Sequence, residues 1–421
     1  MSSHATLIAT DATPGEFRRG WPAVLACFCV ATFAWGFGFY GQSVYFAALQ
    51  QLHGWPASLI ASATTTYYLA GAVFLTQVHR ASALLGPRML LGSGAVILGA
   101  GVIGLSQAFA PWQLYLCSIV MAIGWSATTT TAIATTLAQW FDQRRGLAIS
   151  LALNGASTGG FIIAPLLVQF AHRLGLAQAV LLLVPGALVV LLPVIFAGVG
   201  RASSDHAARM LRASAVTEDR AGLPAFVRQS QALRNLRFWS ISLPFALALA
   251  AQVGFIVHQV AFLLPHLGSA GTGTALASTA VAATVGRLAL ATVIDRLRQR
   301  RVSSISFASQ AAGLALMLAL PDRSWALYAG SVVFGLSVGN VITLPTLIVQ
   351  REFAARSFGM VLGLSSMVGQ AVLSFGPTLL GLARDLTGGY AAALLLCIAL
   401  QLIASVMILV PPGATPRASR A

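Results

Sequence analysis

Long apolar stretches recur along nearly the whole chain, and they constrain its fold more than any other feature. A stretch of about 20 apolar residues is long enough to cross the hydrocarbon core of a bilayer as a helix. Lipid offers the backbone no hydrogen-bond partners, so such a segment must be helical. We therefore expect an all-α membrane protein. Its twelve transmembrane helices are predicted at residues 23–49, 57–79, 89–109, 112–137, 146–170, 178–200, 239–265, 273–294, 302–320, 324–350, 357–383 and 389–411.

The composition excludes a water-soluble fold of this size. The 421 residues are 57% hydrophobic and 8% charged, whereas a soluble domain carries about 25% charged residues. The four cysteines lie within apolar stretches, and no metal-ligand cluster, Walker loop, dinucleotide fingerprint or catalytic constellation is visible. We expect no cofactor, no metal and no enzymatic activity. The first apolar stretch is too long for a signal peptide, so no cleavable signal is expected.

The positions of the positively charged residues along the chain indicate how it is oriented in the membrane. The net charge is +15, and all 25 basic residues are arginine. Twenty-one of them lie in the tails, the central linker and alternate loops, whereas Arg173, Arg323 and Arg384 lie in the opposite loops. Because cytoplasmic loops carry the excess of positive charge, we expect both termini in the cytoplasm. Membrane lipid, and no nucleic acid, is the expected partner of these arginines.

A polar segment divides the chain into two halves of six helices. We expect a cytoplasmic tail at 1–22, a six-helix bundle at 23–200, a cytoplasmic linker at 201–238, a second six-helix bundle at 239–411 and a tail at 412–421. The two halves are weakly similar in sequence, since W-F-D-Q-R-R-G follows the fourth helix and E-F-A-A-R-S-F-G follows the tenth. Repeated halves of this kind are typical of secondary transporters.

Four motifs resemble those of the major facilitator superfamily, and within it the branch of monocarboxylate transporters and oxalate/formate antiporters. They are W-F-D-Q-R-R-G-L-A at 140–148, G-R-L at 286–288 with D-R at 295–296, R-S-F-G at 356–359, and G-P-T-L-L-G-L-A-R-D-L-T-G-G-Y at 376–390. The loop after the second helix lacks the acid that the superfamily usually has there. We expect a monomer in a bacterial inner membrane. The candidate gating or structural residues are Asp142, Arg144, Arg145, Gly146, Asp295, Arg296, Arg356, Gly359 and Asp385.

Arg287 is the foremost candidate for contact with a substrate. It precedes Asp295 by eight residues, or about 12 Å along a helix, which places it near the middle of a core about 30 Å thick. A central arginine costs about 2.5–3.5 kcal/mol on insertion scales, so a hydrated cavity, a partner or an anion must offset it. The guanidinium fork matches a carboxylate. The resemblance implies the same role, and pairing with helix carbonyls or reach to the interface is the alternative.

Other polar residues inside the helices mark a cavity. His258 lies mid-helix, where it is a candidate ligand or proton relay, and Gln252 precedes it on the same helix. For these residues, hydrogen bonding between helices is the alternative interpretation. The remaining candidate substrate-binding residues are Gln42, Tyr40, Tyr45, Asn154, Gln259, Asn340 and Gln370.

The coupling mechanism is constrained by the acidic residues. All ten of them lie in expected loops or at helix ends. Proton-coupled members of the branch carry a lysine in the first helix and an acid one turn before the arginine, and the aligned positions here are Gln42 and Ala283. Proton symport by that arrangement is therefore not expected. Symport with a proton by another route, antiport with a counter-anion and uniport stay open.

The sequence thus predicts a secondary active or facilitative transporter of a small organic anion, a monocarboxylate. Alternating access would rock the halves around a site in which Arg287 holds the carboxylate. An exporter of amphipathic drugs or metabolites, with no anion requirement, is the alternative. A non-transporting sensor or a membrane enzyme would need a signalling domain or a catalytic constellation that the sequence does not show.

Overall fold

The computed structural model describes residues 16–141, 144–200, 233–294, 297–353 and 358–410, and its regular structure there is helical. The first half holds α1 (Glu16–Phe33), η1 (Ala34–Tyr40), α2 (Gly41–His53), α3 (Ala57–Leu75), α4 (Val78–Ser106), α5 (Pro111–Ser126), α6 (Thr130–Leu137), α7 (Arg145–Thr158), η2 (Gly159–Ile163), α8 (Ala164–Leu174) and α9 (Leu176–Gly198). The second half holds α12 (Leu236–Val293), α13 (Gln299–Ala319), α14 (Ser324–Glu352), α15 (Phe358–Ser374), α16 (Gly376–Thr387) and α17 (Ala391–Met407).

The described helices form a protein that crosses the membrane many times. Ten helical stretches among them are long and apolar enough to span a bilayer. One of these covers residues 236–290, about 80 Å at roughly 1.5 Å per residue, which is far longer than one crossing. Gly268 divides it into two helices. The predicted count of twelve also requires α17, which is shorter, to cross. That count and the cytoplasmic placement of the termini stay predictions.

Most expected helix ends lie within a few residues of those in the structure. However, the first helix begins at Glu16 instead of residue 23, and helix replaces the predicted loops on both sides of Gly86 and of Gly268. The predicted loop at residues 266–272 is wrong, because the chain is helical on both sides of this one glycine. Gly268 has a φ of 64°, a conformation that glycine adopts without steric cost. The Thr272 hydroxyl donates to the Gly268 carbonyl over 2.7 Å and closes the first turn of the second helix. The chain therefore reverses direction without a loop.

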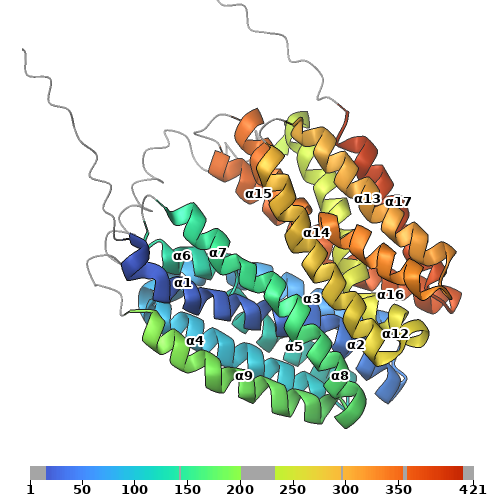
Figure 1. Ribbon diagram of the computed structural model, residues 1–421, viewed down its shortest axis with the longest axis horizontal. Helices are drawn as coiled ribbons and strands as arrows, with labels where there is room; N and C mark the ends of the chain where they lie inside the picture. Colours follow the sequence, from blue (N-terminus) through green and yellow to red (C-terminus); the bar gives the residue numbers. More distant parts are fainter. Residues whose placement is uncertain (1–15, 142–143, 201–232, 295–296, 354–357, 411–421) are drawn as a thin grey trace, which may run out of the picture.

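Figure 1 shows the two halves as the arms of a V. Helices α1 to α9 form one arm, and α12 to α17 form the other. The arms are in contact at one end, where α12 meets α2 and α8 and where α16 meets α3. They diverge at the end where α1 begins and α17 ends (Figure 1). We call these the closed end and the open end.

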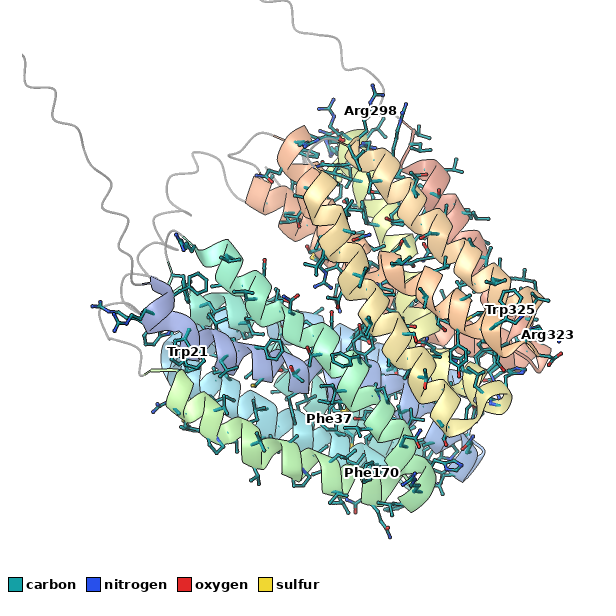
Figure 2. All side chains as sticks on the ribbon, in the orientation of Figure 1. Trp21, Phe37, Phe170, Arg298, Arg323 and Trp325 are labelled. Atoms are coloured by element: carbon teal, nitrogen blue, oxygen red, sulfur yellow. The ribbon has the colours of Figure 1, made fainter. Side chains whose placement is uncertain are left out.

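Arginine and tryptophan side chains mark the two ends of the bundles. Figure 2 shows Arg298 at the open end and Arg323 at the closed end of the second bundle, as the predicted alternation of loops requires. Trp21 lies toward the open end and Trp325 at the closed end (Figure 2), and both indole rings are exposed. Tryptophan is enriched where a membrane meets water. The ends of the arms therefore carry the residues expected of membrane interfaces.

Two π-helical segments, η1 and η2, are in contact within the first arm. In η1 and η2 the backbones are in direct contact, since a Cβ atom on Gly159 would lie 2.4 Å from the Thr32 carbonyl oxygen and 2.6 Å from the Gly36 nitrogen. Only a residue without a side chain allows this approach. A π turn holds one extra residue, which re-aims the side chains beyond it, and such turns are frequent at functional sites.

An ion pair connects four helices at the open end of the second bundle. The Arg300 guanidinium donates to both Glu352 carboxylate oxygens over 2.6 and 2.9 Å, to the Ser240 hydroxyl over 2.9 Å and to the Ile408 carbonyl over 3.1 Å. We expect Glu352→Gln to lower the unfolding temperature by about 3–6 °C, because a hydrogen bond to a charged group contributes about 1.5–3 kcal/mol. Thermal unfolding in detergent measures this. Arg301→Gln, which changes an exposed arginine, is the control. An equal drop in unfolding temperature in that variant would show that the Arg300–Glu352 ion pair does not specifically stabilise the bundle.

Candidate functional site

A cavity of about 320 Å³ lies between the two bundles. Its walls come from η1, α3, α5 and α7 on one side and from α12, α14 and α15 on the other. A ligand in it would touch both halves of the protein. Transporters built from two repeats bind their substrates at such an interface and change access by rocking one repeat against the other.

Arg287 lines this cavity from α12. Its side chain is half-buried, and its Nε atom is buried without a hydrogen-bond partner in the described part of the chain. The guanidinium lies against Gly339 of α14, where a Cβ atom would be 2.8 Å from Nε. A buried donor that lacks a partner is costly. The placement therefore favours contact with a ligand or water over the alternative of pairing with helix carbonyls.

Two further predicted residues line the same cavity. Tyr40 extends from η1 and is almost fully buried. Gln370 extends from α15, and its Nε2 atom donates to the Tyr68 carbonyl over 3.3 Å. Gln252 of α12, which the sequence marked as a cavity residue, lies there too. The fold thus brings Arg287, Tyr40 and Gln370 together from three helices.

His258 lies outside the lining of the cavity. Its Nε2 atom is 3.0 Å from the Pro377 carbonyl and its Nδ1 atom is 3.3 Å from the Tyr390 hydroxyl. A carbonyl only accepts, so Nε2 carries a proton and donates to Pro377, and Nδ1 is paired with the tyrosine hydroxyl. The ring also contacts Phe46 of the first bundle, with centroids 4.3 Å apart. This is the geometry of a histidine that joins neighbouring helices.

The other five predicted substrate-binding residues are also away from the cavity lining. The Tyr45 hydroxyl donates to the Phe37 carbonyl over 3.1 Å, and Gln259 donates to the Thr279 hydroxyl over 3.1 Å. The Asn340 amide donates to the Leu336 carbonyl over 3.2 Å. Gln42 is buried on α2, and Asn154 is partly buried on α7. Tyr45, Gln259 and Asn340 thus have contacts typical of packing between or within helices.

Asp385 is the predicted gating residue whose contacts are clearest. Its two carboxylate oxygens accept from the backbone nitrogens of Ala57 over 3.0 Å and of Ser58 over 2.7 Å. These are the first N–H groups of α3, which have no partner within their own helix. Asp385 belongs to α16, so a carboxylate of the second bundle caps a helix of the first. We call this contact the Asp385 cap.

The remaining gating candidates are less fully described. Arg144 and Gly146 are exposed beside the start of α7. Asp142, Asp295, Arg296 and Arg356 lie outside the described residues, and only the helical backbone is described at Arg145 and Gly359. Their proposed roles at the open end stay predictions.

Sequence reasoning missed five aromatic residues of the cavity, which are Trp35, Phe39, Tyr68, Trp125 and Phe245. The positions of the two tryptophans in the sequence could have identified them as cavity residues. Tryptophan in membrane proteins gathers at the interfaces, whereas Trp35 and Trp125 lie deep inside their apolar stretches. A tryptophan at that depth is better explained by an internal cavity than by an anchor to lipid headgroups.

Comparisons with known proteins agree with this architecture. Residues 28–377 match the family model of the Major Facilitator Superfamily. Monocarboxylate transporter 13 of Rattus norvegicus is 25% identical over 413 residues, covering 95% of this chain and 90% of the relative. Monocarboxylate transporter 11 of Homo sapiens is 26% identical over 438 residues, covering 96% and 85%. The uncharacterized MFS-type transporter YhjX of Escherichia coli (strain K12) is 21% identical over 360 residues, covering 83% and 86%.

Solved structures share the fold at low sequence identity. A crystal structure of the nucleoside transporter NupG has a TM-score of 0.76 and 11% identity, covering 92% of this chain and 99% of that one. The D-xylose-proton symporter has a TM-score of 0.71 and 11% identity, covering 93% and 98%. Identity this low carries no information on substrate, so these two structures establish the architecture alone.

Proposed function

The chain belongs to the Major Facilitator Superfamily, and from this premise we propose that it carries a small organic anion, a monocarboxylate, whose carboxylate binds Arg287. Membership makes the protein a multi-pass secondary transporter and not an enzyme. The proposal adds the cargo and the residue that binds it. The distant relatives named monocarboxylate transporters support the proposed cargo.

One observation carries the proposal, namely the unpartnered guanidinium nitrogen of Arg287 beside a cavity between the bundles. Burying a cation costs free energy, and an anionic ligand offsets this cost best. A carboxylate accepts two parallel hydrogen bonds from a guanidinium, so it fits Arg287 in geometry as well as in charge. A neutral cargo could accept a hydrogen bond from the guanidinium but would not balance its charge, and a cationic cargo would be repelled by it.

The V shape supports alternating access as the transport mechanism. The arms diverge at the open end (Figure 1), where a ligand would enter or leave the cavity. To open the other end, the bundles must separate at the Asp385 cap and at the neighbouring pair formed by the Thr65 and Thr378 hydroxyls, 2.6 Å apart. We propose that the open end faces the cytoplasm, which the distribution of arginines supports.

Uptake by proteoliposomes tests the proposed cargo. The purified protein would be reconstituted and offered labelled monocarboxylates, each beside the matching neutral amide. We expect saturable uptake of carboxylates that other monocarboxylates inhibit and amides do not. Transport of amphipathic cations, with no uptake of any carboxylate, would replace the proposal with the exporter alternative.

Loss of the Asp385 cap is expected to expose the closed end. In Asp385→Ala, a single cysteine placed at Thr65 in a cysteine-free background should react about tenfold faster with a water-soluble thiol reagent. The reason is that a hydrogen bond to a charged group is worth about 1.5–3 kcal/mol, and about 1.4 kcal/mol changes an equilibrium tenfold. Asp322→Ala is the matched control, since Asp322 is an exposed acid on the loop between α13 and α14. Equal labelling rates in the two variants would show that the cap does not hold the closed end.

A further inference from the structure

The two walls of the cavity differ in chemistry. The second bundle supplies the amide and guanidinium side chains, from Gln252, Arg287 and Gln370. The first bundle supplies a surface of aromatic rings, which we call the aromatic wall and define as Trp35, Phe39, Tyr68 and Trp125. A ligand that touches both bundles therefore meets these donors, set among apolar residues such as Phe245 and Val341, on one side and mainly aromatic rings on the other.

Contacts among its own rings and with neighbouring residues of the first bundle hold the aromatic wall in place. The rings of Trp35 and Trp125 lie 5.0 Å apart at an angle of 56°. The Tyr67 ring supports Trp125 at 6.0 Å, and Gly38 leaves room for the indole, since a Cβ atom there would lie 2.8 Å from it. Ring pairs at these spacings are favourable, so the wall is a preformed surface against which another ring can stack.

A chain of three glutamines fixes which side-chain atom of Gln252 is left without a hydrogen-bond partner. Gln401 of α17 donates through Nε2 to the Ala248 carbonyl over 3.1 Å and to Gln310 Oε1 over 2.6 Å. Gln310 of α13 donates through Nε2 to Gln252 Oε1 over 2.7 Å. The Ala248 carbonyl can only accept, so it sets the direction of the whole chain.

The end of this chain is a free donor. Gln252 is 1% exposed, and its Nε2 atom has no hydrogen-bond partner in the described part of the protein. Gln252 lines the same cavity as Arg287, whose Nε atom also lacks a partner. Two unmatched buried donors thus belong to residues of the same cavity wall, and a carboxylate oxygen is the kind of acceptor that each of them lacks.

Building on the proposed function, we infer that the cargo is a carboxylate with an aromatic ring, whose polar end binds Arg287 and Gln252 and whose ring stacks on the aromatic wall. The cavity volume of about 320 Å³ corresponds to roughly ten water molecules at about 30 Å³ each. A two-carbon acid leaves most of that volume to water. A ring attached to the carboxylate fills it and reaches the indoles.

The test compares phenylacetate with acetate in proteoliposomes, and phenylacetamide serves as the uncharged analogue. We expect a KM for phenylacetate at least about tenfold lower than for acetate, because stacking and apolar burial add to the carboxylate contacts. Phenylacetamide should compete far less than phenylacetate. In the double variant Trp35→Leu and Trp125→Leu, the ratio of the two KM values should fall toward one.

A separate set of variants tests whether the glutamine chain positions Gln252. Gln401 lies outside the cavity lining, so a purely structural role would change the amount of folded protein and leave KM alone. As a positioning residue, Gln401→Leu should raise the KM for phenylacetate with little change in kcat. The double variant Gln252→Leu with Gln401→Leu should be no worse than Gln252→Leu alone, since both act through one amide. Additive effects would overturn this role.

The outcomes separate this inference from the function on which it rests. Equal KM values for acetate and phenylacetate, with both activities lost in Arg287→Gln, would overturn the aromatic cargo and leave the organic-anion transporter in place. Uptake of neither acid, nor of any other monocarboxylate, by the unaltered protein would remove both.

Discussion

Arg287→Gln is expected to lower kcat/KM for carboxylate uptake by about 100-fold or more. A bidentate contact between a guanidinium and a carboxylate consists of two charge-assisted hydrogen bonds. Each is worth about 1.5–3 kcal/mol, and about 1.4 kcal/mol corresponds to a factor of ten. Glutamine keeps much of the length of the side chain but provides no charge and no fork. Initial rates of uptake in proteoliposomes, corrected for the amount of folded protein, measure the effect.

Arg287→Lys is the matched control for charge. Lysine keeps the positive charge but is a point donor without the planar fork, so we expect activity between that of the native protein and that of Arg287→Gln. Size-exclusion profiles of all three proteins should coincide, because the Nε atom of Arg287 makes no hydrogen bond in the described structure. Native uptake rates in Arg287→Gln would eliminate the anion site and leave the family assignment intact.

Gly286→Ala is expected to lower the unfolding temperature by roughly 6–12 °C. Gly286 lies where α12 crosses α14, and a Cβ atom there would be 1.9 Å from the Leu336 carbonyl oxygen. Carbon–oxygen contacts are normally about 3.3 Å or longer, so the two helices would have to separate by more than about 1 Å. Overpacking of this kind costs about 3 kcal/mol or more, which at roughly 2–4 °C per kcal/mol gives the expected shift.

Gly363→Ala controls for the added methyl group itself. Gly363 is in α15 of the same bundle, and a Cβ atom there would meet nothing within 4 Å. Alanine has the higher helix propensity, so this variant should unfold at or slightly above the native temperature.

The neighbouring Arg287 is positioned by the α12–α14 crossing, and Gly286→Ala should therefore also raise the KM for carboxylates. Unchanged stability in Gly286→Ala would show that the helices part easily.

The helices themselves could be predicted from the sequence because length and apolarity are local properties. A stretch of about 20 apolar residues can only be a helix in a bilayer, whatever the rest of the chain does. The predicted depth of Arg287 also rests on local spacing, and it stays a prediction. The chain reversal at Gly268 was harder to place, since one glycine with a positive φ replaced the predicted loop.

The sequence by itself determined the fold class, the two halves and the one arginine placed in mid-helix. Only the tertiary structure decided which side chains meet that arginine. Gln252 and His258 lie six residues apart on α12, yet the first lines the cavity and the second is hydrogen-bonded to Pro377. In water, an amphipathic pattern reveals the buried face of a helix. In lipid the surroundings are as apolar as the protein interior, so only packing shows which face of each helix borders the cavity.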